Sequence, residues 1–209
     1  MSSSWWPWAA LALLGAYHGL NPGMGWLFAV ARGLQERKRG AVLGSLLPIA
    51  LGHEASIVVV VIAVSLTEQF LPPFFMRLLA ALVLVSFGVY KLVKPLSHPK
   101  GFGMRIGFAG LAGWSFLMSS AHGAGLMLAP VLLGMPVAGA YHTLSEITMQ
   151  AVFAASIHVT AMLLVMGIVA IVVYEKVGLR ILRRGWLNMD LDWSLVLIAS
   201  GAITLFTAL

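Results

Sequence analysis

The chain has 209 residues, of which 60% are hydrophobic and only 10% charged, whereas a soluble domain averages about 25% charged residues. This composition excludes an ordinary soluble globular protein and predicts an all-α integral membrane protein. The sequence contains no cysteine, which excludes thiolate metal ligands, disulfides and dithiol redox chemistry. The net charge is +6, but the basic residues lie between apolar segments and indicate membrane topology rather than nucleic-acid binding.

Six apolar segments follow one another along the chain, and each has the roughly 20 residues that a helix needs to cross the hydrocarbon core. They cover residues 5–31, 41–66, 73–93, 106–134, 145–174 and 188–208. The first, fourth and fifth are longer than one crossing needs, which predicts that they are tilted, broken or extended beyond the bilayer. The sequence therefore predicts six transmembrane helices and no soluble domain.

The basic residues are distributed unevenly between the two sides of this predicted bundle. Twelve of the thirteen lie in or beside the connections after the first, third and fifth segments: Arg32, Arg37, Lys38, Arg39, Lys91, Lys94, Lys100, Arg105, Lys176, Arg180, Arg183 and Arg184. The exception, Arg77, lies just inside the third segment. The positive-inside rule places these connections in the cytoplasm and both termini outside. We expect a bacterial inner (plasma) membrane protein.

Four histidines near the centres of four different segments form two matched pairs. His18 is followed by His53 after 35 residues, and His122 is followed by His158 after 36. Three segments per half is an odd number, so the second half enters the membrane from the opposite side to the first. This pattern predicts a 3+3 inverted-topology repeat of residues 1–94 and 95–209, an architecture that places a binding site at the repeat interface near the midplane.

An ionisable side chain in the middle of a membrane is costly and is usually functional. Neutral imidazole binds transition-metal cations well, so we expect His18, His53, His122 and His158 to be ligands of one site. The alternative is that each ring bonds a neighbouring backbone group or hydroxyl and fastens the bundle.

The first segment has a predicted helix break directly after His18. Pro22 lacks an amide donor and disfavours helical geometry at Asn21, while Gly19 and Gly23 permit unusual backbone shapes and close helix approach. Such a break must face protein or water because lipid cannot satisfy its backbone groups. Asn21 is expected to bond these groups or to offer a ligand oxygen; the alternative is a simple packing kink.

The fourth segment repeats the His-Gly step at His122-Gly123, with a proline further along. Helices one and four are therefore both expected to be broken. The patterns Gly15-x-x-x-Gly19 and Gly19-x-x-x-Gly23 are helix-contact signals, and they leave a homo-oligomer open.

Two polar residues accompany His53 in the second segment. Ser56 lies one turn away and is expected to orient the ring of His53 or to bond an adjacent helix. Glu54 points about 100° away around the helix, and a carboxyl at this depth needs a proton or a partner. It is interpreted as an assisting metal ligand, a proton-relay group or a carboxyl kept neutral by a neighbouring helix.

Methionines accompany the histidines as well. Met118 lies four residues before His122, and Met162 lies four residues after His158. A thioether beside an imidazole suits a soft or borderline metal, but methionine at helical spacing equally fits core packing.

The stretch from Gly15 to Ile57 resembles the NicO family of nickel/cobalt efflux proteins, within the LysE transporter superfamily. The residues that match its motifs are His18, Leu20, Pro22, Gly23, Gly25, His53 and Ser56. Met24 stands where the family has a second histidine, and Ala121-His-Gly-Ala-Gly replaces a Pro-Cys-Pro-like turn. The resemblance implies secondary transport of a divalent transition metal, usually outward, and the departures leave open whether Met24 replaces a ligand.

Three functions follow as hypotheses. The first is a secondary transporter for nickel, cobalt, zinc or copper, in which protonation of imidazole releases the ion and which is not an enzyme. A phosphate-binding loop is absent from the sequence, which argues against direct use of ATP. The second is a LysE-type exporter of a small anion or amino acid, and the third is an intramembrane haem-binding protein with paired histidine ligands. The lipid bilayer and the metal ion are the expected partners, with no nucleic acid.

Overall fold

A computed structural model describes residues 5–68, 70–94, 106–133, 144–177 and 189–206, and within these ranges the regular structure is entirely helical. In chain order the elements are α1 (Trp6–Leu20), the 3-10 helix η1 (Pro22–Met24), α2 (Trp26–Glu36), α3 (Arg39–Glu68), α4 (Pro73–Val93), α5 (Phe108–His122), α6 (Ala124–Leu133), α7 (Leu144–Val172), the π-helix η2 (Val173–Val177) and α8 (Met189–Phe206). The predicted all-α class is confirmed for the described residues.

Three of the described helical stretches are long and apolar enough to cross a membrane: Arg39–Val64, Pro73–Val93 and Val152–Lys176. The stretch Leu191–Phe206 is apolar but shorter. α4 has the predicted bounds and begins at Pro73, whose fixed φ suits the first turn of a helix. At this level the chain has the structure of a helical membrane protein.

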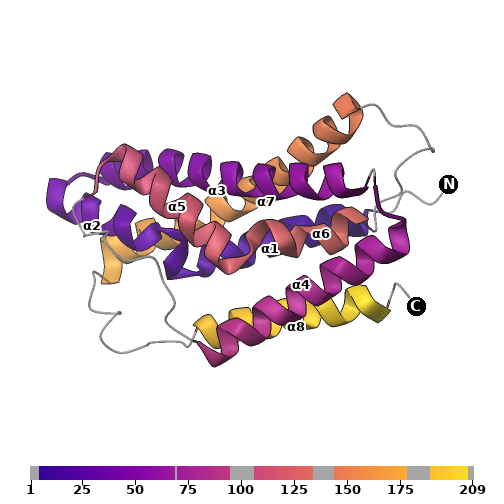
Figure 1. Ribbon diagram of the computed structural model, residues 1–209. Coiled ribbons are helices and arrows are strands. Elements are labelled where there is room, and N and C mark those ends of the chain that lie inside the picture. Colours follow the sequence, from indigo (N-terminus) through magenta and orange to yellow (C-terminus); the bar gives the residue numbers. More distant parts are fainter. Residues whose placement is uncertain (1–4, 69, 95–105, 134–143, 178–188, 207–209) are drawn as a thin grey trace.

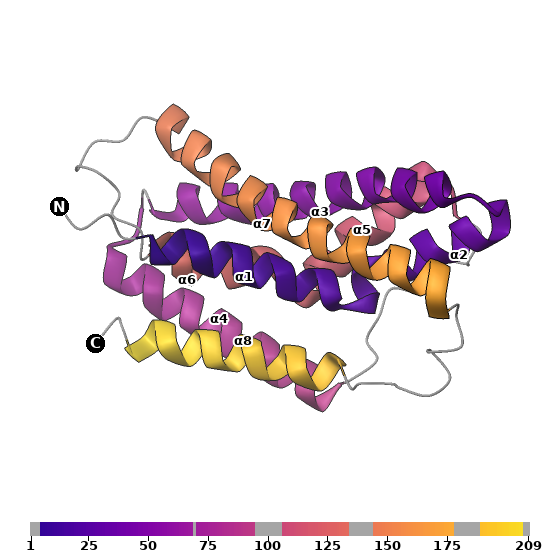
Figure 2. The same ribbon diagram turned by 180° about the vertical axis from the view of Figure 1, so that it is seen from behind.

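The helices pack as three side-by-side pairs (Figures 1 and 2). α1 runs along α7, α3 runs along α5, and α4 runs along α8. The α4–α8 pair lies on one side of the other four, and α6 connects the two groups because it contacts both α3 and α4. The first and second pairs meet where α3 packs against α7, so the centre of the bundle lies between α1, α3, α5 and α7.

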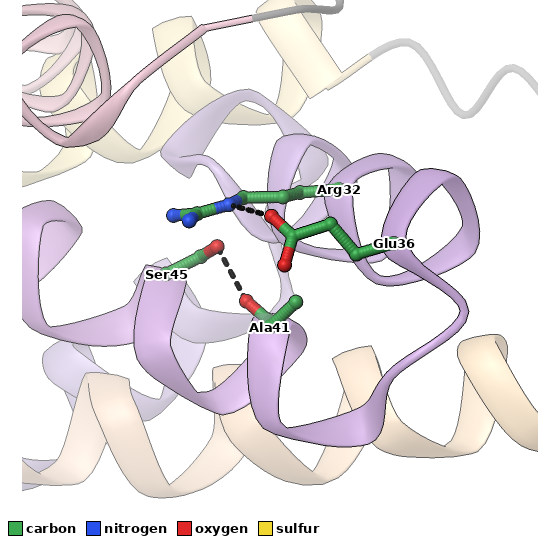
Figure 3. A network of polar contacts seen from close by, with 4 residues as sticks. All are labelled: Arg32, Glu36, Ala41 and Ser45. Atoms are coloured by element: carbon green, nitrogen blue, oxygen red, sulfur yellow. Dashed lines mark hydrogen bonds and ion pairs between the residues drawn. The ribbon is translucent and has the colours of Figure 1, made fainter.

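One end of the bundle carries the corner between α2 and α3, the end of α4 and the end of η2 (Figure 1, left). Arg37 reverses the chain there with a left-handed φ of 52°, and Arg39 pairs with Glu175 of η2 at 3.3 Å. Figure 3 shows the Arg32–Glu36 ion pair at 2.7 Å on α2, beside the start of α3. The described ends of the predicted basic connections thus share one end of the bundle, whereas their cytoplasmic orientation remains a prediction.

Glycine allows two of the helix pairs to touch backbone to backbone. A Cβ atom on Gly15 would lie 2.1 Å from the carbonyl oxygen of His158, and one on Gly52 would lie 2.0 Å from that of Ala112. A Cβ atom on Gly19 would lie 2.5 Å from the carbonyl oxygen of Met162. The predicted glycine contact signals on α1 are therefore used within one chain, against α7.

Both predicted helix breaks are present. α1 and α2 are separated at residues 21–25 by η1, and Gly25 has a φ of 121°. α5 and α6 are separated at Gly123, which has a φ of 68° and caps α5. Since these conformations suit glycine, Gly25 after Met24 and Gly123 after His122 explain where α2 begins and where α5 ends.

We predict that Gly15→Ala lowers the free energy of unfolding by about 1–3 kcal/mol, the usual cost of overpacking, because the added methyl group meets the backbone of α7. The melting temperature of the purified protein in detergent measures this effect. Gly44→Ala is the matched control, since Gly44 lies within α3 with nothing within 4 Å of its Cβ position. Equal melting temperatures for the two variants would contradict the close α1–α7 contact.

Candidate metal centre

Three of the four predicted histidines come together in the centre of the bundle. His18 of α1, His53 of α3 and His158 of α7 are all buried, and one ring nitrogen from each lies within 4.8 Å of the other two. The ring centroid of His18 lies 4.7 Å from that of His158 and 5.4 Å from that of His53. His53 and His158 are stacked at 5.7 Å. The close α1–α7 contact at Gly15 makes this approach possible.

Hydrogen bonds to the backbone fix the orientation of two of these rings. Nδ1 of His18 lies 2.7 Å from the carbonyl oxygen of Leu14, and Nδ1 of His158 lies 3.3 Å from that of Leu11. A carbonyl oxygen only accepts, so Nδ1 carries the proton in both rings and donates it. Nε2 is then left with an unshared electron pair, as in histidines that ligate a metal and donate their other N–H to the backbone.

The buried side-chain polar atoms that lack a hydrogen-bond partner belong to five residues of the described part of the chain. They are Nε2 of His18, Nδ2 of Asn21, both ring nitrogens of His53, Oγ of Ser119 and Nε2 of His158. Each buried polar group without a partner costs about 1–3 kcal/mol, and such groups are rare in folded proteins. Four of these six atoms belong to the three histidines, which makes this group the candidate site.

The alternative in which each histidine only fastens the bundle accounts for part of this geometry. It explains Nδ1 of His18 and of His158, which bond backbone carbonyls. It does not explain His53, whose two ring nitrogens have no partner in the part of the chain that the structure describes. A ligand would explain why Nε2 of His18, Nε2 of His158 and both ring nitrogens of His53 lack partners.

His122 does not join this group, contrary to the expectation of four converging rings. Its Nδ1 donates to the carbonyl oxygen of Met118 at 2.8 Å, which matches the bond of His18. However, the ring of Trp193 packs edge-on against both, with its centroid 4.4 Å from that of His18 and 5.5 Å from that of His122. Tyr17 stacks on Trp193 at 5.4 Å. The bulky indole therefore lies against both imidazoles.

Asn21 directly follows α1, and its unpartnered side-chain atom is the amide nitrogen, not the oxygen that was expected to be a ligand. Its Oδ1 accepts the backbone N–H of Gly23 at 2.8 Å, and its own backbone N–H donates to the carbonyl oxygen of His18 at 3.1 Å. The side-chain oxygen is thus engaged in capping η1, which begins at Pro22. The group left without a partner is the Nδ2 donor, so Asn21 offers a hydrogen-bond donor rather than a metal-binding oxygen.

Three tryptophans satisfy carbonyl oxygens at the helix breaks. Trp26 donates its indole N–H to the carbonyl of Leu20 at 3.2 Å, and Trp114 donates to that of Gly23 at 3.2 Å. Trp193 donates to that of His122. Sequence reasoning missed this role, although a tryptophan well inside an apolar segment, away from the membrane interface, is a signal that its N–H bonds another buried group.

Two further predicted residues, Ser56 and Glu54, lie on α3 with His53. Ser56 bonds Ser120 at 2.9 Å and so ties α3 to α5. Glu54 is half-buried and is not part of the histidine group. Its assisting role stays a prediction.

The three methionines are almost completely buried. Met24 and Met162 belong to the main apolar core. The terminal methyl of Met118 lies 3.3 Å from the position of a Cβ on Gly23. Their surroundings fit core packing, and sulfur ligation stays a prediction.

Comparisons with protein-family models, with curated proteins and with solved structures find no match to this chain. The resemblance to the NicO family therefore rests on the residues quoted above.

We predict that Trp193→Phe lowers the free energy of unfolding by more than about 1 kcal/mol, because it leaves the buried carbonyl of His122 without its donor. Thermal unfolding in detergent measures the change. Trp8→Phe serves as a control, since Trp8 packs against Phe153 at a centroid distance of 5.3 Å through its ring. An equal loss in both variants would show that the indole N–H of Trp193 contributes nothing of its own.

Proposed function

We propose that this protein is a secondary membrane transporter for a divalent transition-metal cation, which binds to His18, His53 and His158. The observation that carries the proposal is the convergence of three buried imidazoles with unpartnered Nε2 atoms. Imidazole suits nickel, cobalt, zinc and copper, whereas calcium and magnesium prefer oxygen ligands. The donor set therefore favours a transition metal as the substrate.

The order and lengths of the helices support a 3+3 inverted repeat. α1 and α2 have 15 and 11 residues, and α5 and α6 have 15 and 10. α3 and α7 have 30 and 29 residues, and α4 and α8 have 21 and 18. Exchange of the two halves turns the α1–α7 pair into the α5–α3 pair and leaves the α4–α8 pair unchanged.

In this arrangement the site receives ligands from both halves. His18 and His53 come from the first half, and His158 comes from the second. Rocking of one half against the other then opens the site to each side of the membrane in turn. The resemblance to the NicO family implies that net movement is outward.

The two other hypotheses fit the site less well. A porphyrin needs space between its two axial imidazoles, but α1 and α7 touch backbone to backbone at Gly15 and His158. A bare anion does not suit the imidazoles of His18 and His158, because Nε2 of each ring is left with an unshared electron pair and no proton to donate. Both features favour a cation.

We predict that alanine at position 18, 53 or 158 lowers the affinity for Ni²⁺ or Co²⁺ by more than about 100-fold, since even the outer partners of metal ligands are worth 10- to 100-fold. Metal titration of the purified protein, with elemental analysis of the bound metal, measures this loss. His122→Ala is the matched control and is expected to bind nearly as tightly as the wild type.

Transport completes this test. Proteoliposomes that enclose a metal-sensitive dye should take up Ni²⁺ or Co²⁺ with the wild-type protein and not with His53→Ala. If all four alanine variants bind metal like the wild type, the proposed site is wrong. If binding is lost but wild-type liposomes never move metal, the site binds metal without transporting it.

A further inference from the structure

Ser119 differs from the other hydroxyl residues within the described helices. Five of those hydroxyls donate to the carbonyl four residues earlier: Ser45, Thr67, Ser120, Ser156 and Thr204. Such a local bond is the usual solution for serine or threonine inside a helix. The hydroxyl of Ser119 is fully buried and makes no hydrogen bond, so it is left with a donor to offer.

Two contacts between α3 and α5 place Ser119 beside the turn of His53. The hydroxyl of Ser115 donates to the carbonyl of Ile49 at 2.7 Å, and Ser120 bonds Ser56 at 2.9 Å. Ser119 lies between these contacts on α5, as His53 lies between them on α3. The unpartnered hydroxyl and the unpartnered imidazole are therefore at the same level of the helix pair.

Asn21 brings a second unpartnered donor to the same region. It follows His18 by less than one turn, and its buried Nδ2 makes no hydrogen bond with the residues that the structure describes. The break that contains Asn21 packs on α5 just before Ser119, because Trp114 bonds the carbonyl of Gly23 and Met118 lies against Gly23. Nδ2 of Asn21 is thus close to His18 along the chain, and Oγ of Ser119 is level with His53 along the α3–α5 pair.

These donors are unsuited to a bare cation, because an N–H or O–H group presents its positive end to the ion. Three imidazoles also leave one position of a tetrahedral metal open. An oxygen ligand in that position would bind the metal and accept hydrogen bonds at the same time. We infer that the cation is carried with an oxygen ligand, either water or a carboxylate, which accepts hydrogen bonds from Nδ2 of Asn21 and Oγ of Ser119. This inference rests on the proposed metal site.

Ser119→Ala tests the inference through two measurements that should move in different directions. Loss of a charge-assisted hydrogen bond is expected to lower the affinity for Co²⁺ by about tenfold or more. The melting temperature of the metal-free protein should stay the same or rise, because the variant removes a buried hydroxyl without a partner. A residue with a merely structural role would instead lower the melting temperature.

Ser120→Ala is the matched control on the next residue of α5, whose hydroxyl is already bonded to Phe116 and Ser56. It should leave the affinity for Co²⁺ unchanged. If Ser119→Ala and Ser120→Ala bind Co²⁺ equally, the inference is overturned. If the wild type itself does not bind Co²⁺, the proposed metal site fails, and this outcome is distinct.

Acetate distinguishes the two sources of oxygen. A saturable change in the visible spectrum of the Co²⁺-loaded wild type on addition of acetate indicates a carboxylate ligand, and a constant spectrum indicates water. Asn21→Asp keeps the acceptor for the Gly23 N–H but replaces the Nδ2 donor with a negative oxygen. Where acetate binds the wild type, it should bind this variant at least tenfold more weakly, and equal binding would remove Asn21 from the inference.

Discussion

The candidate site depends on hydrogen bonds that imidazoles make with backbone carbonyls of the bundle. Because Nδ1 of His18 and of His158 donates to a carbonyl oxygen, Nε2 of each ring is left as an acceptor next to His53. Buried polar groups without a hydrogen-bond partner are costly. On the proposed function, a cation that accepts electron pairs from the imidazoles would remove that cost and so gain affinity from these unsatisfied groups.

Within the described residues, backbone carbonyls at the helix breaks find partners among side chains. The helix breaks free several carbonyl oxygens, and indole N–H groups of Trp26, Trp114 and Trp193 bond them. Glycine at positions 15 and 52 lets the helices approach until their backbones touch. These carbonyls at the breaks thus have donors within the protein, whereas Nε2 of His18, Nε2 of His158 and both ring nitrogens of His53 have no partner among the described residues.

Part of this arrangement was predictable from the sequence because it depends on local properties. Apolar length predicts the helices, and the Gly and Pro steps predict both breaks. The contacts that determine which side chains meet at the candidate site join helices that are far apart in sequence. The absence of His122 from the histidine group, the Ser56–Ser120 bond and the unpaired hydroxyl of Ser119 depend on how helices are rotated against one another. A pattern within one helix does not specify that rotation. The predicted convergence of all four histidines was therefore wrong and Ser119 was missed, whereas one of the two alternatives for Ser56, a bond to an adjacent helix, is confirmed.

X-ray absorption spectroscopy of the Zn²⁺-loaded protein tests the central claim most directly. Three histidine ligands predict a first shell of nitrogen and oxygen atoms at about 2.0–2.1 Å, with outer-shell scattering from three imidazole rings. In a His158→Gln variant, this signal should lose one ring, which would identify His158 of α7 as one of the three ligands. A spectrum with one imidazole or none, or one that His158→Gln leaves unchanged, would contradict the account.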